Sequence, residues 1–136
     1  MGTGAARDAR HRSSRVSAQL IDTSVLAGDT APQEPGTWAV SVVTIGELEV
    51  GVLLAPGKLR AQRLARLAGI LEQAPVLMVD RRVAAHYAQL RAASGRQPAN
   101  DLWIAATALA HELTLLTADT RQAALPGVQA TLVPVA

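Results

Sequence analysis

Apolar residues along this chain gather in short runs that alternate with longer amphipathic segments. The short runs at residues 19–22, 38–43, 76–79, 113–117 and 130–135 predict strands. The segments between them predict helices over residues 44–55, 58–73, 81–93 and 101–111. Strands that alternate with helices favour right-handed crossovers, so we expect an α/β fold with a mostly parallel five-stranded sheet covered by helices.

Two local patterns refine the helices. Thr44 is expected to cap the helix that follows the second strand, because Glu47 stands three residues later as in a capping box. The helix over residues 58–73 is expected to be amphipathic, with four leucines along one side: Leu59, Leu64, Leu67 and Leu71.

The first 17 residues differ in composition from the rest of the chain. They are rich in Gly, Ala, Arg and Ser and have no apolar period, which predicts a disordered tail over residues 1–17 and one folded domain over residues 18–136. Four arginines against one aspartate give the first 19 residues a net charge of +3, whereas nine basic and ten acidic residues give the remainder −1. The nearly neutral domain does not indicate a nucleic-acid partner by charge alone.

Composition excludes several classes of function. The chain has no cysteine, so thiol catalysis, disulfide scaffolds and cysteine-ligated metals are excluded. No apolar run is long enough to span a membrane, and we expect a cytoplasmic protein. Only Trp38, Tyr87 and Trp103 are aromatic, which disfavours modules that stack nucleic-acid bases on aromatic side chains.

Four acidic residues stand at the ends of predicted elements. Asp22 and Asp119 each follow a strand, Asp101 opens a helix, and Glu47 lies in the first turn of another. Each has a structural interpretation, as a turn acid, a helix-dipole partner or a capping-box member. Together they favour one pocket at the carboxyl edge of a parallel sheet. Adjacent carboxylates repel, and a hard divalent cation such as Mg²⁺ or Mn²⁺ relieves that repulsion through oxygen ligands.

The segments that carry these acids resemble the PIN domains of VapC-type toxins from bacterial toxin–antitoxin pairs. The resemblance spans about residues 20–135. It rests on five segments and a closing Pro126-Gly127 turn: residues 21–26, 41–51, 79–80, 100–108 and 115–119.

The resemblance implies a metal-dependent endoribonuclease toxin that hydrolyses RNA phosphodiester bonds with a metal-activated water. It implies that Asp22, Glu47, Asp101 and Asp119 are both catalytic and Mg²⁺-binding, with Mn²⁺ as an alternative ion. It also implies supporting hydroxyls, a cognate antitoxin partner and a homodimer that can join a larger toxin–antitoxin complex. The supporting hydroxyls are those of Thr23, Ser24 and Thr117, which otherwise serve as caps and turn residues.

The chain departs from the family pattern after its last acid. Many members have Asp-Phe where this chain has Gln122 and Ala123, so we expect one fewer carboxylate near the metal and a less anchored loop. This departure keeps open an alternative, a catalytically weak PIN fold that only binds RNA or a partner. A response-regulator receiver is disfavoured because it needs a lysine near its last strand, and the only lysine of this chain, Lys58, lies in the middle. A haloacid-dehalogenase-like phosphatase is disfavoured because it needs a second aspartate two residues after the first, where this chain has Ser24.

Three arginines are candidates for binding RNA phosphates. Arg91, Arg96 and Arg121 lie in or near the segments that carry Asp101 and Asp119. The alternative is that they are ordinary solvated surface residues.

Overall fold

A parallel five-stranded sheet organises the molecule, as seen in a computed structural model that describes residues 18–27 and 37–134. Both the predicted tail over residues 1–17 and the Pro/Gly segment over residues 30–36 lie outside the described residues. The strands are β1 (Gln19–Ile21), β2 (Trp38–Ser41), β3 (Val76–Leu77), β4 (Thr114–Thr117) and β5 (Ala130–Leu132), in the spatial order β3-β2-β1-β4-β5. All four strand pairings are parallel, which confirms the predicted fold class.

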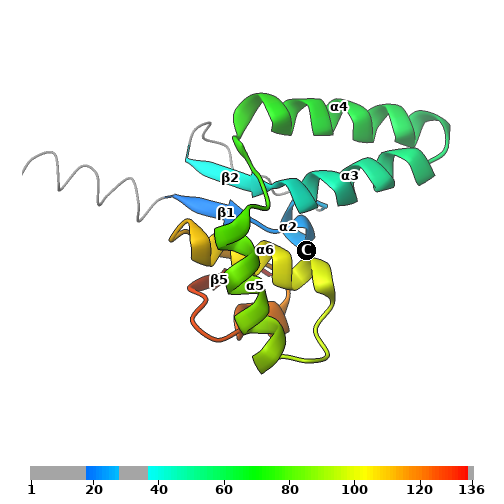
Figure 1. The fold of residues 1–136 in the computed structure, drawn as a ribbon. Helices are drawn as coiled ribbons and strands as arrows, with labels where there is room; N and C mark the ends of the chain where they lie inside the picture. Colours follow the sequence, from blue (N-terminus) through cyan, green and yellow to red (C-terminus); the bar gives the residue numbers. More distant parts are fainter. Residues whose placement is uncertain (1–17, 28–36, 135–136) are drawn as a thin grey trace, which may run out of the picture.

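Helices connect the strands and cover the sheet (Figure 1). The longer helices are α3 (Val42–Leu54), α4 (Gly57–Gln73), α5 (Arg81–Ala93) and α6 (Ala99–Ala110). Two four-residue helices, α2 (Thr23–Leu26) and α7 (Thr120–Ala123), begin directly after β1 and β4. In the described part of the chain, no helix has both the length and the apolar character needed to cross a membrane.

The sheet separates two apolar clusters. One joins β1 and β4 to α5 and α6 and includes Leu20, Ile104 and Leu115, all fully buried. The other packs β1 and β2 against α3 and α4 and includes Ile21, Val40 and Ile70. Because alternate residues of a strand point to opposite faces, neighbours such as Leu20 and Ile21 supply both clusters.

The start of α3 differs from the capping box predicted from sequence. Ser41, the last residue of β2, is the N-cap, and its hydroxyl accepts a hydrogen bond from the backbone N–H of Val43 at 3.0 Å. Thr44 lies inside the helix and is fully buried, so Thr44 and Glu47 do not form a capping box. The helix begins two residues early because Ser41 offers the same capping hydroxyl at the point where the strand ends.

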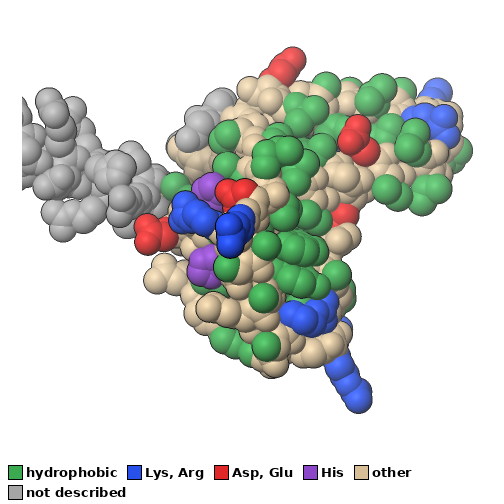
Figure 2. Space-filling view, in the orientation of Figure 1, with side chains coloured by type: hydrophobic (Ala, Val, Ile, Leu, Met, Phe, Trp, Pro, Cys, Tyr) green, Lys and Arg blue, Asp and Glu red, His purple; other side chains and the backbone are tan. Residues whose placement is uncertain are grey.

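The predicted helix with its four leucines is present as α4, but its leucine side is only partly buried. Of the four leucines, only Leu67 is buried, while Leu59, Leu64 and Leu71 are exposed at 41%, 56% and 47%. Helix α4 packs instead through Leu67 and Ile70. Together α3 and α4 form a hairpin at one end of the molecule, and Figure 2 shows hydrophobic side chains along it.

Candidate active site

The strand order reverses at β1, which places two of the predicted acids at neighbouring strand ends. From β1 the chain proceeds to β2 on one side, whereas β4 pairs with β1 on the other side. Ligands bind at such topological switch points, beyond the carboxyl ends of the strands. The backbone N–H of Asp22 donates to the carbonyl of Leu116 at 2.8 Å, which fixes the end of β1 against the end of β4.

Asp22 and Asp119 occupy equivalent places on these two strands. Asp22 is the N-cap of α2 and accepts a hydrogen bond from the backbone N–H of Ser24 at 2.9 Å. Asp119 is the N-cap of α7 and accepts from the backbone N–H groups of Arg121 and Gln122. These bonds explain why acids suit the positions structurally, and they hold each carboxylate in one orientation.

The other two acids come from longer helices. Asp101 lies in the first turn of α6, and Glu47 lies in α3. The hydroxyl of Thr23 donates to Glu47 Oε1 at 2.6 Å and lies 3.1 Å from the hydroxyl of Thr44. Thr23 therefore ties the α3 acid to the turn that carries Asp22.

The other three carboxylates act electrostatically on Asp101. The pKa of Asp101 is raised from 3.8 to about 6, first by burial and then by the negative charges of Asp22, Asp119 and Glu47. Arg121 acts in the opposite direction and lowers the pKa of Asp101. The structure thus brings the four predicted acids to one edge of the sheet, where neighbouring like charges disfavour ionisation.

The three predicted hydroxyl residues lie among these acids. Besides the bond from Thr23 to Glu47, the hydroxyl of Ser24 accepts from the backbone N–H of Ala118 at 3.0 Å and lies 3.4 Å from the hydroxyl of Thr117. Thr117 is fully buried, and its hydroxyl accepts from the backbone N–H of Asp119 at 3.1 Å. These bonds join the β1–α2 turn to the β4–α7 turn.

Gln122 has a structural importance that the sequence did not reveal. It is fully buried, and its Nε2 donates to Asp22 Oδ1 at 3.0 Å and to the backbone carbonyl of Asp101 at 3.1 Å. Its Oε1 accepts from the hydroxyl of Thr117 at 2.6 Å. The expectation of a poorly anchored loop is wrong, because this amide joins β1, β4 and α6. The only sequence signal for Gln122 was that it stands three residues after Asp119, where many family members have an aspartate.

The donor set suits a hard divalent cation. It consists of carboxylates and hydroxyls, without thiols or imidazoles. Within residues 18–27 and 37–134, however, no group of three or more His, Cys, Asp or Glu side chains is arranged to hold a metal ion. Oxygen donors of this kind nevertheless suit Mg²⁺, which usually keeps several of its waters in protein sites.

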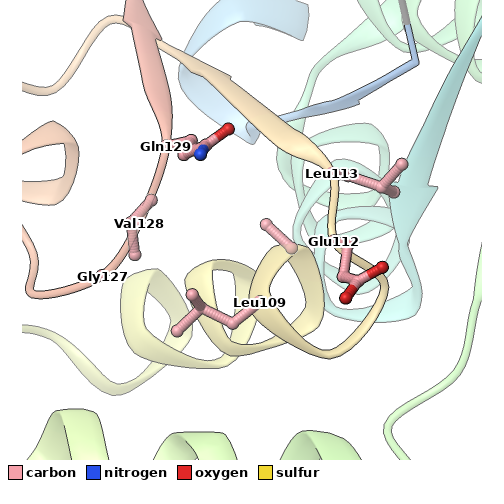
Figure 3. A pocket seen from close by; sticks show the side chains of 7 residues that line it. Leu109, Glu112, Leu113, Gly127, Val128 and Gln129 are labelled. Carbon is pink, nitrogen blue, oxygen red and sulfur yellow. The ribbon is translucent and has the colours of Figure 1, made fainter. Parts of the chain in front are cut away.

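A separate cavity of about 330 Å³ lies away from the acids (Figure 3). Leu109, Glu112 and Gln129 line it at the C-terminal end of α6 and the start of β5. Asp101 lies at the opposite end of α6, so this cavity is not part of the acidic site.

Comparison with known proteins identifies the family. The family model for the PIN domain matches residues 11–128, and this chain belongs to the PIN domain family. Ribonuclease VapC4 of Mycobacterium tuberculosis is 42% identical over 120 residues, covering 81% of this chain and 92% of that protein. Toxin FitB of Neisseria gonorrhoeae is 36% identical over 121 residues, covering 74% of this chain and 87% of that protein.

Solved structures agree with this assignment. A member of the VapBC family of toxin–antitoxin systems from Mycobacterium tuberculosis, VapBC-5, superposes with a TM-score of 0.68 and 38% identity, covering 88% of this chain and 99% of that chain. The FitAcB structure from Neisseria gonorrhoeae gives a TM-score of 0.69 and 32% identity, with 82% and 95% covered.

Replacing Asp101 by Asn should stabilise the metal-free protein at neutral pH. Because the pKa of Asp101 is higher in the folded state, the folded protein binds this proton more tightly than the unfolded chain. Ionisation of Asp101 therefore lowers stability as pH rises from about 4 to above about 6. We expect Asp101→Asn to melt at a higher temperature than wild type near pH ~7.5 in EDTA, and the gain to shrink towards pH ~4.

Melting curves across this pH range measure the effect. Glu72→Gln, which removes an exposed carboxylate from α4, is the control and should change the melting temperature little at either pH. A gain for Asp101→Asn that does not vary with pH would refute the electrostatic explanation.

Replacing Gln122 by Leu should destabilise the fold strongly. The variant removes three hydrogen bonds and leaves buried partners unsatisfied, at roughly 1–3 kcal/mol for each such group. Thr107→Val is a matched control, because it removes one buried hydrogen bond, from the Thr107 hydroxyl to the carbonyl of Trp103, outside the acidic site. Urea unfolding should show a clearly larger loss of stability for Gln122→Leu than for Thr107→Val. Equal losses in the two variants would contradict the stabilising role of the three Gln122 hydrogen bonds.

Proposed function

We propose that this chain is the toxin of a toxin–antitoxin pair and that it hydrolyses RNA phosphodiester bonds with the help of a divalent cation, most simply Mg²⁺. The observation that carries the proposal is the convergence of Asp22, Glu47, Asp101 and Asp119 at the switch point of a PIN fold. Relatives that share 36–42% identity with this chain are named ribonucleases or toxins, which supports the activity.

The four carboxylates would hold the cation. When bound, Mg²⁺ supplies positive charge at the scissile phosphate and activates a water molecule for attack. The protein prepares the acids beforehand: the amide of Gln122 and the N–H of Ser24 orient Asp22, and Thr23 orients Glu47. Such fixed groups need little reorganisation during the reaction, which is how preorganised sites lower barriers.

The cation also resolves the electrostatic conflict of the metal-free site. The raised pKa of Asp101 means that the protein is destabilised when all four carboxylates are ionised. A bound divalent ion favours their ionised forms and stabilises the folded protein through linkage. Binding and catalysis therefore depend on the same unfavourable charge cluster.

A cognate antitoxin is the partner we propose, and we propose that the toxin forms a homodimer. The VapBC-5 structure that resembles this chain bears the name of a toxin–antitoxin system, and the relative FitB is named a toxin. The α3–α4 hairpin offers suitable apolar surface, because Leu53 and Leu54 are exposed at 68% and 79%. A cavity of about 230 Å³ beside it is lined by both Leu67 and the acidic Glu47, so a partner bound there would also reach the acidic site.

Asp22→Asn should abolish RNA cleavage without unfolding the protein. Asparagine is also a good N-cap, so the variant keeps the start of α2 and removes one negative charge. We expect the cleavage rate to fall by a factor of about 10² or more, as for other key electrostatic groups. Asp80→Asn is the matched control, since Asp80 is the N-cap of α5, accepts from the N–H of Val83 at 2.9 Å, and is not one of the four acids of the site.

The same assay, repeated with different cations, distinguishes catalysis from binding alone. Mg²⁺ or Mn²⁺ should support cleavage, EDTA should abolish it, and Ca²⁺ should raise the melting temperature without supporting turnover. Full cleavage in EDTA would refute the metal-dependent mechanism. If a divalent cation stabilises the protein and RNA binds but is not cleaved, the binding-only PIN fold is favoured. The observation that supports this alternative is the amide of Gln122, which stands where many family members have a carboxylate.

A further inference from the structure

The arginines in the described part of the chain fall into two groups according to what their guanidinium groups bind. Five of them donate to backbone carbonyls and so have structural roles: Arg60, Arg63, Arg66, Arg82 and Arg91. The other three described arginines, Arg81, Arg96 and Arg121, have no side-chain hydrogen bond or ion pair among the described residues. Their guanidinium groups are therefore available to an external anion.

Arg96 and Arg121 line the same open cavity. It measures about 420 Å³ and lies between the loop that joins α5 to α6 and the segment formed by α7 and the two residues after it. Ser94 and Gln97 supply further polar groups to its wall, and Leu125 supplies an apolar one. Figure 2 shows basic side chains at the end of the molecule formed by this loop.

The backbone positions of both arginines are fixed before any ligand arrives. Arg91 donates to the carbonyls of Gly95 at 3.2 Å and Gln97 at 2.9 Å, which holds the loop on both sides of Arg96. Arg121 lies in the first turn of α7, where its N–H donates to Asp119 at 2.8 Å. Anchoring the backbone reduces the entropy cost when the two side chains close on a ligand.

The cavity adjoins the acidic site. Arg121 follows Asp119 by two residues and is close enough to lower the pKa of Asp101. Gln122, the next residue, donates to the backbone carbonyl of Asp101 at 3.1 Å. A polyanion that reaches the carboxylates therefore passes within range of this arginine pair.

We propose that Arg96 and Arg121 form a subsite for a phosphate of the RNA strand next to the phosphate held at the acidic site. This inference rests on the proposed ribonuclease function. The carboxylates repel an approaching polyanion, and two arginines beside them offset that repulsion. Guanidinium groups bind phosphate through paired, charge-assisted hydrogen bonds. Interactions of this kind position the strand without reading its sequence.

The double variant Arg96→Ala/Arg121→Ala tests the subsite. Binding to a short fluorescein-labelled single-stranded RNA is measured by anisotropy in EDTA over a series of salt concentrations, so that no cleavage intervenes. The slope of log K against log salt is negative, and its magnitude should decrease by about 0.7 for each phosphate that the variant no longer binds. In Mg²⁺, the variant should raise KM for RNA cleavage by about fivefold or more with little change in kcat, because the two arginines bind the strand without acting on the scissile bond.

Arg81→Ala is the matched control. Arg81 is exposed and also has no side-chain hydrogen bond among the described residues. Its neighbour Arg82 donates to the carbonyl of Ala110 at the C-terminal end of α6, opposite the end that carries Asp101. The control should keep the wild-type salt slope and KM, and melting curves should show that all variants remain folded.

Several outcomes would overturn the subsite. An unchanged salt slope and KM in the double variant would do so, as would an equal effect in Arg81→Ala, which would indicate diffuse surface charge. Absence of both RNA binding and cleavage in the wild type would overturn the subsite together with the proposed function. An arginine-dependent salt slope in a protein that cleaves no RNA would support the subsite and refute the catalytic proposal alone.

Discussion

The parallel pairing of β1 with β4 brings together the two turns that carry Asp22 and Asp119, on which the rest of the acidic site depends. It sets Ile21 opposite Leu116 and bonds the N–H of Asp22 to the Leu116 carbonyl, although these residues are far apart in sequence. The two turns that follow then share one edge of the sheet, and each places an aspartate as a helix N-cap. Loss of this register would separate Asp22 from Asp119, and no local interaction could restore the site.

The acidic site is held together against its own repulsion. Burial and three neighbouring carboxylates raise the pKa of Asp101 to about 6, so the charged cluster destabilises the fold. Hydrogen bonds oppose this effect, most of all those of the fully buried Gln122. A neutral amide at this point joins three elements without adding a fifth negative charge. Functional sites often trade stability for activity in this way.

Sequence reasoning succeeded where strong patterns act over short distances. Alternating apolar runs predicted the parallel sheet, and acids after strands predicted which residues would meet at its edge, because parallel strands direct their carboxyl ends to one side. It failed where two residues compete for one role: Ser41 caps α3 in place of Thr44, since both offer a hydroxyl within a few residues. Periodicity correctly predicted an amphipathic helix over α4 but could not show how much of its leucine side is covered, because the helical hairpin extends from the sheet and leaves Leu59, Leu64 and Leu71 exposed.

Gln122 shows the limit of sequence reasoning more clearly. A glutamine in a short helix is typical of a surface position, and its burial depends on long-range hydrogen bonds with Asp22 and with the start of α6. Likewise, the sequence could not separate Arg91, which holds its own loop, from Arg96 and Arg121, which face the cavity. Only the folded structure distinguishes an arginine that is bonded to backbone carbonyls from one whose guanidinium group can bind an external anion.

The most direct test of a shared cation-binding cluster is an NMR titration of the Asp101 side-chain carboxyl in the metal-free protein. We predict a midpoint near pH 6 that falls when Asp22 is replaced by Asn, and that also falls from the wild-type value when Mg²⁺ is added. A midpoint close to the ordinary value of 3.8 in the wild type, or one that responds neither to Asp22→Asn nor to Mg²⁺, would contradict such a cluster.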